Sequence, residues 1–121
     1  MGDLSKNFSL SEFKCKCGEC DQISPPLELV TELQEMRDHF GKSVSIHSGH
    51  RCPKYNALVG GAKYSKHLEA VAADHTVEGH TPDEVQRYWL RKHPDKYGIG
   101  RYNTFTHFDV RSIKGRWDNR K

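Results

Sequence analysis

The sequence predicts a single α+β domain in which helices pack on a mostly antiparallel sheet. Three observations support this prediction. The 121 residues, taken as one domain over 1–121, suit a chain with one small core. Two segments carry apolar residues at helical spacing. Several shorter segments are apolar or alternate as strands do, and the last two follow each other as a hairpin would.

The first long helix is expected to begin in a turn-forming segment. Ser24 can cap a helix, and the prolines that follow it are tolerated in a first turn. One face then carries apolar residues three or four positions apart, namely Leu29, Leu33, Met36 and Phe40. Gly41 is expected to end this helix.

A capping box opens the second long helix, because Glu84 follows Thr81 by three residues. Its apolar side carries Val85, Tyr88 and Trp89. The helix closes before Pro94, which cannot continue it. A short helix is also expected around Tyr55–Val59, stopped by Gly60.

Four segments are expected to form strands: Val44–His47, Val71–Val77, Tyr97–Tyr102 and Phe105–Arg111. A turn at Asn103 joins the last two. Residues 1–25 look irregular, and the polar tail 115–121 is expected to be loose.

Composition excludes a membrane-spanning chain and says little about partners. Hydrophobic residues make up 35% of the chain, and the formal net charge is +3. Such mild basicity suits an anionic partner such as bacterial cell wall or nucleic acid, but many solvated surfaces carry as much. No apolar run has membrane-spanning length, and the first six residues lack the apolar stretch of a secretory signal. We therefore expect a protein made in the cytoplasm, with no membrane insertion.

Four cysteines allow three interpretations. Cys15, Cys17 and Cys20 lie close together, and Cys52 lies apart. They can form a structural metal site, because the spacing of Cys17 and Cys20 resembles a zinc knuckle. They can form one or two disulfides in an oxidising compartment. They can also be thiols on a loop, and none of these interpretations makes a cysteine catalytic.

His67, Asp74 and His107 form a candidate metal set. Two imidazoles and one carboxylate suit zinc, and three protein ligands leave a fourth position open for water, as in catalytic zinc sites. Zinc lowers the pKa of such a water to about 7. His67 and Asp74 converge only if the chain turns between them. Chance is the alternative, because eight of the 121 residues are His.

Longer motifs cover nearly the whole chain up to Arg111. They are Leu4-Ser5-Lys6-Asn7-Phe8-Ser9-Leu10-Ser11-Glu12-Phe13, Ser48-Gly49-His50-Arg51-Cys52-Pro53, Gly60-Gly61-Ala62-Lys63-Tyr64-Ser65-Lys66-His67, Gly98-Ile99-Gly100-Arg101-Tyr102 and His107-Phe108-Asp109-Val110-Arg111. In these motifs the chain resembles the D-alanyl-D-alanine carboxypeptidase type of zinc peptidase. That family includes phage L-alanyl-D-glutamate endolysins and D,D-dipeptidases, and it shares its fold with hedgehog signalling domains.

The resemblance implies roles for five residues. His67, Asp74 and His107 would be the zinc ligands. Arg51 matches an arginine that faces the substrate and the developing oxyanion, where a fixed guanidinium stabilises charge in the transition state; a structural ion pair is the alternative. Ser65 would hold either the substrate or its own loop.

The chain departs from the family pattern at three positions. Ala70 stands where the family often has Gly, which is tolerable if its φ is negative. His50 stands where the family often has Tyr. Thr104 stands where several relatives carry a Glu three residues before the last ligand, so the general base is open. Asp109 is the nearest carboxylate and would act as base or support the site by hydrogen bonding; His50, His75 and Tyr102 are other possible proton partners.

The resemblance predicts a monomeric zinc peptidase that cuts peptides of peptidoglycan. It implies action at the cell wall or in the periplasm after release, or as part of a phage particle. The alternative is a zinc-binding structural or wall-binding domain without catalysis, which the missing Glu and the hedgehog relatives suggest. A nucleic-acid-binding module is not expected, because no basic stripe with interleaved aromatic residues occurs.

Overall fold

The computed structural model describes residues 4–17, 24–61 and 65–121. Its sheet has five strands in the order β1-β2-β4-β3-β5. The strands are β1 (Val44–Ser48), β2 (Ala72–Val77), β3 (Gly98–Arg101), β4 (Thr106–Asp109) and β5 (Gly115–Asp118). All neighbours pair antiparallel except β3 and β5, which are parallel. The predicted α+β class with a mostly antiparallel sheet is confirmed.

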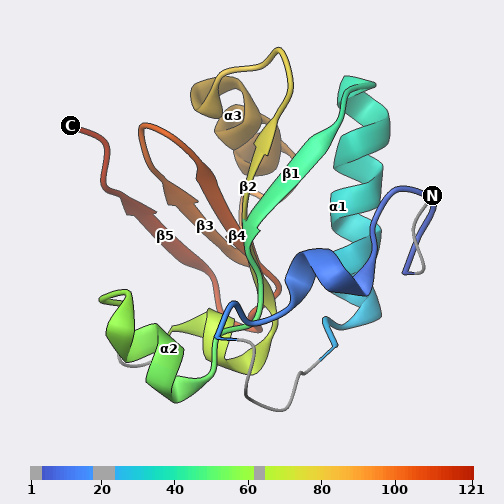
Figure 1. Cartoon of the computed structure of the whole chain (residues 1–121). Helices are drawn as coiled ribbons and strands as arrows, with labels where there is room; N and C mark the ends of the chain where they lie inside the picture. Colours follow the sequence, from blue (N-terminus) through green and yellow to red (C-terminus); the bar gives the residue numbers. More distant parts are fainter. Residues whose placement is uncertain (1–3, 18–23, 62–64) are drawn as a thin grey trace.

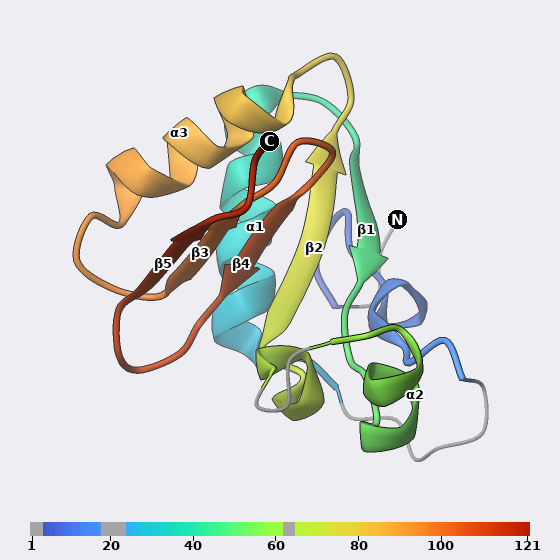
Figure 2. The ribbon, with the colours of Figure 1, turned by 90° about the vertical axis from the view of Figure 1, so that its left-hand side faces the viewer.

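Two long helices cover one face of this sheet (Figures 1 and 2). They are α1 (Leu27–Phe40) and α3 (Pro82–Lys92). A shorter helix, α2 (Pro53–Leu58), and two 3-10 helices, η1 (Leu10–Phe13) and η2 (Lys66–Glu69), complete the described elements. In the part of the chain that the structure describes, no helix combines the length and apolar character needed to cross a membrane.

Helix α1 begins later than the sequence predicts. Pro26 occupies the N-cap position and no side chain caps the helix, so the expected cap at Ser24 is wrong. The end is as predicted: Gly41 adopts a left-handed conformation (φ 65°) and its N–H bonds to the carbonyl of Arg37. The buried side carries Leu29, Val30, Leu33 and Met36.

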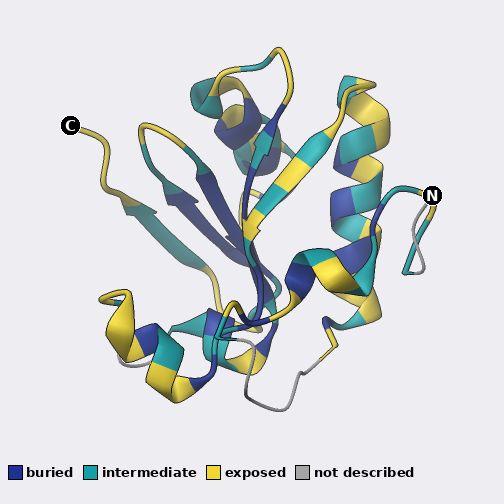
Figure 3. Ribbon diagram, viewed as in Figure 1, coloured by how far each residue is buried: buried dark blue, intermediate teal, exposed yellow. Residues whose placement is uncertain are grey.

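The capping box at Thr81 is confirmed and fixes the start of α3. The Thr81 hydroxyl accepts from the Glu84 N–H, and the Glu84 carboxylate accepts from the Thr81 N–H. Trp89 of α3 then stacks on Phe108 of β4, with ring centroids 3.8 Å apart. Around this pair the core gathers apolar residues of α1, α3, β2 and β3 together with Phe8 and Phe13, and Figure 3 shows β2, β3 and β4 as its most buried strands.

The two chain ends are more ordered than predicted. Within residues 1–25, the described part includes the 3-10 helix η1, whose Phe13 is buried. The expected loose tail is wrong for Gly115–Asp118, which form strand β5 beside β3. Its Arg116 donates hydrogen bonds to the carbonyls of Tyr97, His93 and Lys96, and this non-local anchoring is what holds a polar tail in place.

The face of the sheet away from α1 and α3 carries one transverse row of side chains. Asp74 of β2 lies opposite His107 of β4, His107 opposite Gly100 of β3, and Gly100 opposite Trp117 of β5. Because side chains alternate along a strand, Asp109 shares this face with His107, while Phe108 points into the core.

Two glycines of β3 make room on this face. A Cβ at Gly100 would lie 2.4 Å from the indole nitrogen of Trp117, and one at Gly98 would lie 2.3 Å from a carboxylate oxygen of Asp109. Side chains at these positions would therefore displace Trp117 and Asp109.

Candidate metal centre

The pairing of β2 with β4 places Asp74 and His107 side by side. They are register partners in the sheet, and Asp74 Oδ1 lies 3.0 Å from His107 Nδ1. Both residues are largely buried. A contact between residues 33 positions apart thus follows from one strand register.

His67 reaches the same point from the 3-10 helix η2. The Ser65 hydroxyl caps this helix by accepting from the His67 N–H. The His67 carbonyl accepts from the Arg51 N–H, and His67 Nδ1 lies 2.6 Å from the Gly49 carbonyl oxygen. The loop after β1 therefore fixes both the backbone and the ring of His67.

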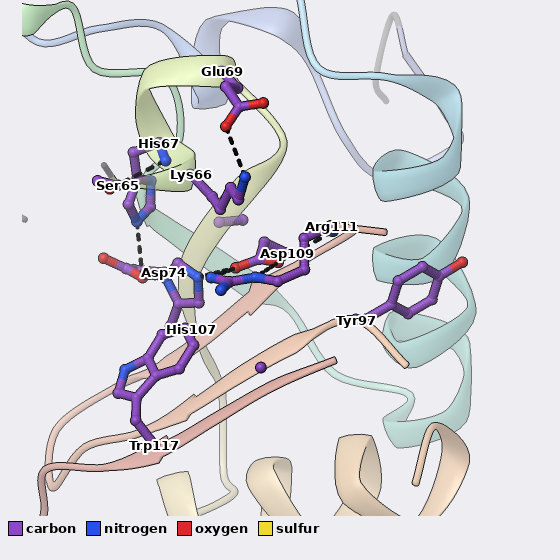
Figure 4. Close-up of polar contacts among 12 residues, drawn as sticks. Ser65, Lys66, His67, Glu69, Asp74, Tyr97, His107, Asp109, Arg111 and Trp117 are labelled. Carbon is purple, nitrogen blue, oxygen red and sulfur yellow. Dashed lines mark hydrogen bonds and ion pairs between the residues drawn. The ribbon is translucent and has the colours of Figure 1, made fainter. Parts of the chain in front are cut away.

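The three side chains converge. One donor atom from each of His67, Asp74 and His107 lies within 4.8 Å of the other two. Figure 4 shows them pointing toward one another from η2, β2 and β4. The two rings meet edge to face with centroids 5.1 Å apart.

The hydrogen bonding of His67 suits a cation between these side chains. The Gly49 carbonyl can only accept, so the ring proton resides on Nδ1 and Nε2 carries a lone pair. That Nε2 is buried, has no hydrogen-bond partner among the described residues, and lies 3.2 Å from Asp74 Oδ1. Two lone pairs at this distance repel unless a cation lies between them. Neutral imidazole and carboxylate donors are also ligands that zinc accepts, so the set fits zinc.

The electrostatic environment of His67, Asp74 and His107 favours a positive charge between these side chains. Burial raises the pKa of Asp74, but the hydrogen bond and charge of His107, together with the neighbouring His67 ring, outweigh it and hold the pKa below its usual range. Burial lowers the pKa of His107, but hydrogen bonds to Asp109 and Asp74 and the charges of both carboxylates raise it overall. Two ionised carboxylates thus surround the His107 ring.

Asp109 lies behind His107 and does not line the cleft. It is fully buried, and its Oδ2 lies 2.6 Å from His107 Nε2. Arg111 donates to both oxygens at 2.7 Å. Burial raises the pKa of Asp109, but the hydrogen bonds from Arg111 and His107 prevail and lower it. Of the two roles open for Asp109, this geometry favours support of His107 over that of a base.

Arg51 lies at the edge of the donor cluster. Its three guanidinium nitrogens donate to Ser48 Oγ at 3.1 Å, Asn56 Oδ1 at 3.1 Å and Asp74 Oδ2 at 3.4 Å. It also lines the cleft. The structural ion pair is therefore present, and because the guanidinium also borders the cleft, the substrate-facing role stays a prediction.

A cleft of about 860 Å³ opens over the donor cluster. Besides Arg51 and Ser65, its walls include Lys66, Tyr102, Phe105, Arg111 and Trp117. Of the expected proton partners, Tyr102 lines this cleft. His50 is buried and is not among the lining residues, and burial lowers its pKa.

His75 points to the opposite side of the sheet from Asp74. It is completely buried, its Nε2 accepts from the indole N–H of Trp89 at 3.0 Å, and its Nδ1 lies 3.1 Å from the Ala73 carbonyl oxygen. Burial lowers its pKa to about 4, so the ring is neutral at pH 7. The expectation that His75 could be a proton partner at the site is wrong, because adjacent residues on a strand face opposite sides.

Trp117 is one of the site residues that the sequence analysis did not identify, as are Lys66, Phe105 and Arg111. Its ring lies 4.9 Å from that of His107 between centroids, its N–H donates to the Tyr102 hydroxyl at 2.9 Å, and the Arg111 guanidinium lies over it. A tryptophan in an otherwise polar tail was the available signal.

Ala70 does not have the negative φ that would make an alanine tolerable at this position. Its φ is 60° and its ψ is 20°, the left-handed conformation that favours glycine. This residue ends η2 and reverses the chain between His67 and Asp74. The turn that the metal set requires is therefore made by a strained alanine, at a cost of about 1 kcal/mol.

The cysteines form a second cluster away from the cleft. One sulfur from each of Cys15, Cys17 and Cys52 lies within 4.8 Å of the others. Cys20 lies outside the described residues.

The chain matches a known family over most of its length. A family model described as Peptidase M15 matches residues 6–109, which include all three members of the donor cluster and Arg51. A comparison with curated proteins finds no match. Since the family match covers well over half of the chain, the protein belongs to the peptidase M15 family, the D-alanyl-D-alanine carboxypeptidase type of zinc peptidase.

Proposed function

We propose that this protein is a zinc-dependent peptidase that hydrolyses peptide bonds in the stem peptides or crosslinks of bacterial peptidoglycan. The observation that carries the proposal is the buried Nε2 of His67, which has no hydrogen-bond partner among the described residues and lies 3.2 Å from an Asp74 carboxylate oxygen where both residues line the cleft. Membership of the peptidase family supports the chemistry, and the cleft supports the choice of substrate.

His67, Asp74 and His107 would hold the ion. Zinc in such a set acts as a Lewis acid on a peptide carbonyl and lowers the pKa of a water to about 7. Two neighbouring groups prepare the donor atoms for metal binding. Gly49 fixes the tautomer of His67, and Asp109 orients His107 and makes its ring a better donor, which is the usual task of a carboxylate behind a ligating imidazole.

Arg51 would stabilise the negative charge that grows on the carbonyl oxygen. Its guanidinium is held by Ser48, Asn56 and Asp74 before any substrate arrives, so little reorganisation is needed at the moment of reaction. Tyr102 also lines the cleft and would assist. Its oxygen accepts from Trp117, which leaves its own O–H free to donate to the substrate.

The charge of the cleft supports a substrate that carries carboxylates. Arg51, Lys66 and Arg111 line it, and Asp74 is the one carboxylate among the described lining residues. Peptidoglycan stem peptides carry several free carboxylates and D-residues, and a cationic cleft would attract them. We propose that the protein acts at the cell wall, after release from the cell that makes it or as part of a phage particle. Ser65 would contribute by holding the loop that carries His67.

One observation favours a second candidate, a wall-binding domain that has lost catalysis. Thr104 replaces the usual Glu, and Asp109 is enclosed by His107 and Arg111. No carboxylate besides Asp74 lines the described cleft, so a base would have to come from Tyr102 or from the substrate. The intact donor cluster and the family match make the peptidase the better supported of the two.

The test is digestion of purified peptidoglycan, followed by loss of turbidity and by mass analysis of the released peptides. The peptidase proposal predicts a single type of peptide product, lost on chelation, restored by zinc and absent in His67→Ala. Identification of the product names the bond. A folded, zinc-loaded protein that sediments with cell walls but releases no peptide from several wall types would support the binding domain instead.

A further inference from the structure

The cysteine cluster joins two segments that are far apart in the sequence. Cys15 and Cys17 follow η1, whereas Cys52 precedes α2. Cys15 and Cys52 are buried and Cys17 is partly exposed. None of the three lines the cleft over His67, so the cluster is separate from the candidate metal centre.

The separation of the sulfurs suits a common metal ion. Cys52 Sγ lies 3.7 Å from Cys17 Sγ, and all three sulfurs lie within 4.8 Å of one another. Zinc–sulfur bonds of about 2.3 Å at tetrahedral angles place two sulfurs about 3.8 Å apart. A disulfide requires about 2.05 Å and joins only two of the three.

Backbone N–H groups already point at two of these sulfurs. The Cys52 N–H donates to Cys15 Sγ at 3.3 Å, and the Tyr55 N–H donates to Cys52 Sγ at 3.4 Å. Such donors stabilise the thiolate form that binds metal. Lys16 and Lys54 lie beside Cys17 and Cys52 and add positive charge to this surface.

We propose that Cys15, Cys17 and Cys52 bind a structural zinc ion as thiolates. Soft sulfur ligands select zinc over the hard cations that are more abundant in cells. Around the cluster, the His50 N–H bonds to the Phe13 carbonyl and the Arg51 N–H to the His67 carbonyl. The ion therefore fastens residues 10–17 to the loop that presents Gly49 and Arg51, and so braces the wall of the candidate metal centre from behind.

The first experiment uses cobalt, because a sulfur–cobalt bond gives a near-ultraviolet charge-transfer absorption that imidazole and carboxylate ligands do not give. The full chain is loaded with Co²⁺, and the band is compared in the unaltered protein, Cys52→Ser and His67→Ala. We expect the band to be lost in Cys52→Ser and kept in His67→Ala. A band absent from the unaltered protein would overturn the proposal. The outcome does not depend on peptidase activity.

A second experiment avoids variants that fail to fold. The unaltered zinc-loaded protein is alkylated with iodoacetamide with and without chelator, and peptide mass mapping reads Cys15, Cys17 and Cys52 separately. We expect all three to be protected until the chelator is added. Labelling without chelator would overturn the proposal, and so would protection that yields to a reductant but not to the chelator, because that result identifies a disulfide.

Discussion

Asp109 Oδ2 lies 2.6 Å from Nε2 of His107, while Nδ1 of the same ring faces Asp74. The two nitrogens thus have separate tasks. Nε2 donates its proton to a buried carboxylate, which leaves Nδ1 as the nitrogen available to a metal. Asp109 in turn forms an ion pair with Arg111. Alternating charges therefore connect Arg111, which lines the cleft, to the His107 ring.

The first prediction tests Asp109 as a positioning residue. Asp109→Asn removes the charge behind His107, so we expect zinc affinity to fall about 10- to 100-fold. Activity should recover in excess zinc, and the pH profile of the recovered activity should keep its shape. Competition with a chelating dye measures the affinity.

Asp118→Asn is the matched control. Asp118 pairs with Arg120 two residues later, as Asp109 does with Arg111, but it is exposed and does not contact His107. Its zinc affinity should not change. A base at position 109 would give the opposite pattern, with normal affinity and a large loss of kcat that zinc does not restore.

The second prediction concerns Arg51. A lysine keeps the charge but cannot bond Ser48, Asn56 and Asp74 together. Arg51→Lys should therefore lower kcat about 10²- to 10³-fold while zinc content stays unchanged. Arg87→Lys, at an exposed arginine paired with Asp83, should leave both quantities unchanged. Full activity of Arg51→Lys would show that the arginine serves only as an ion pair.

The third prediction is a pH dependence of stability. The Tyr97 hydroxyl donates to Glu28 Oε2 at 2.6 Å, and burial together with this carboxylate raises its pKa well above the usual 10. Folding therefore favours the neutral phenol. A raised pKa contributes stability that is complete below pH 10 and is lost as the pH climbs toward the folded-state pKa.

Tyr97→Phe should cost about 1 kcal/mol near neutral pH, because one hydrogen bond is lost. The difference in free energy of unfolding between Tyr97→Phe and the unaltered protein should shrink above about pH 10. Urea unfolding over this range provides the measurement. Glu28→Gln keeps a hydrogen-bond acceptor without the negative charge. Its loss of stability at alkaline pH should therefore be smaller than that of the unaltered protein. A difference that stays constant with pH would refute the linkage.

Local patterns in the sequence predicted most of the fold. Apolar spacing located α1 and α3, the capping box at Thr81 fixed one boundary, and Gly41 fixed another. These features act within a few residues of each other, so they can be recognised in the sequence. The start of α1 was missed because Ser24 is a good cap by type, whereas the chain turns two residues later at Pro26.

The remaining features depend on contacts between distant segments. His75 is next to Asp74 in the sequence, yet the pleat of β2 turns it toward Trp89 in the core. Strand β5 exists because it pairs with β3 and because Trp117 packs beside His107. Neither partner can be identified from the tail alone. The cluster of His67, Asp74 and His107 was anticipated because the family resemblance supplied the long-range information.

The last prediction tests whether Gly100 is glycine in order to place Trp117. A Cβ there would lie 2.4 Å from the indole nitrogen, so Gly100→Ala should push the ring away from His107 and Tyr102. We expect a destabilisation of about 1–3 kcal/mol, typical of overpacking, together with reduced peptidase activity. In a Trp117→Ala background the same substitution meets no indole and should cost at least about 1 kcal/mol less. Denaturant unfolding of the four proteins measures this coupling. Additive losses would mean that Gly100 is required by the strand itself and not by Trp117.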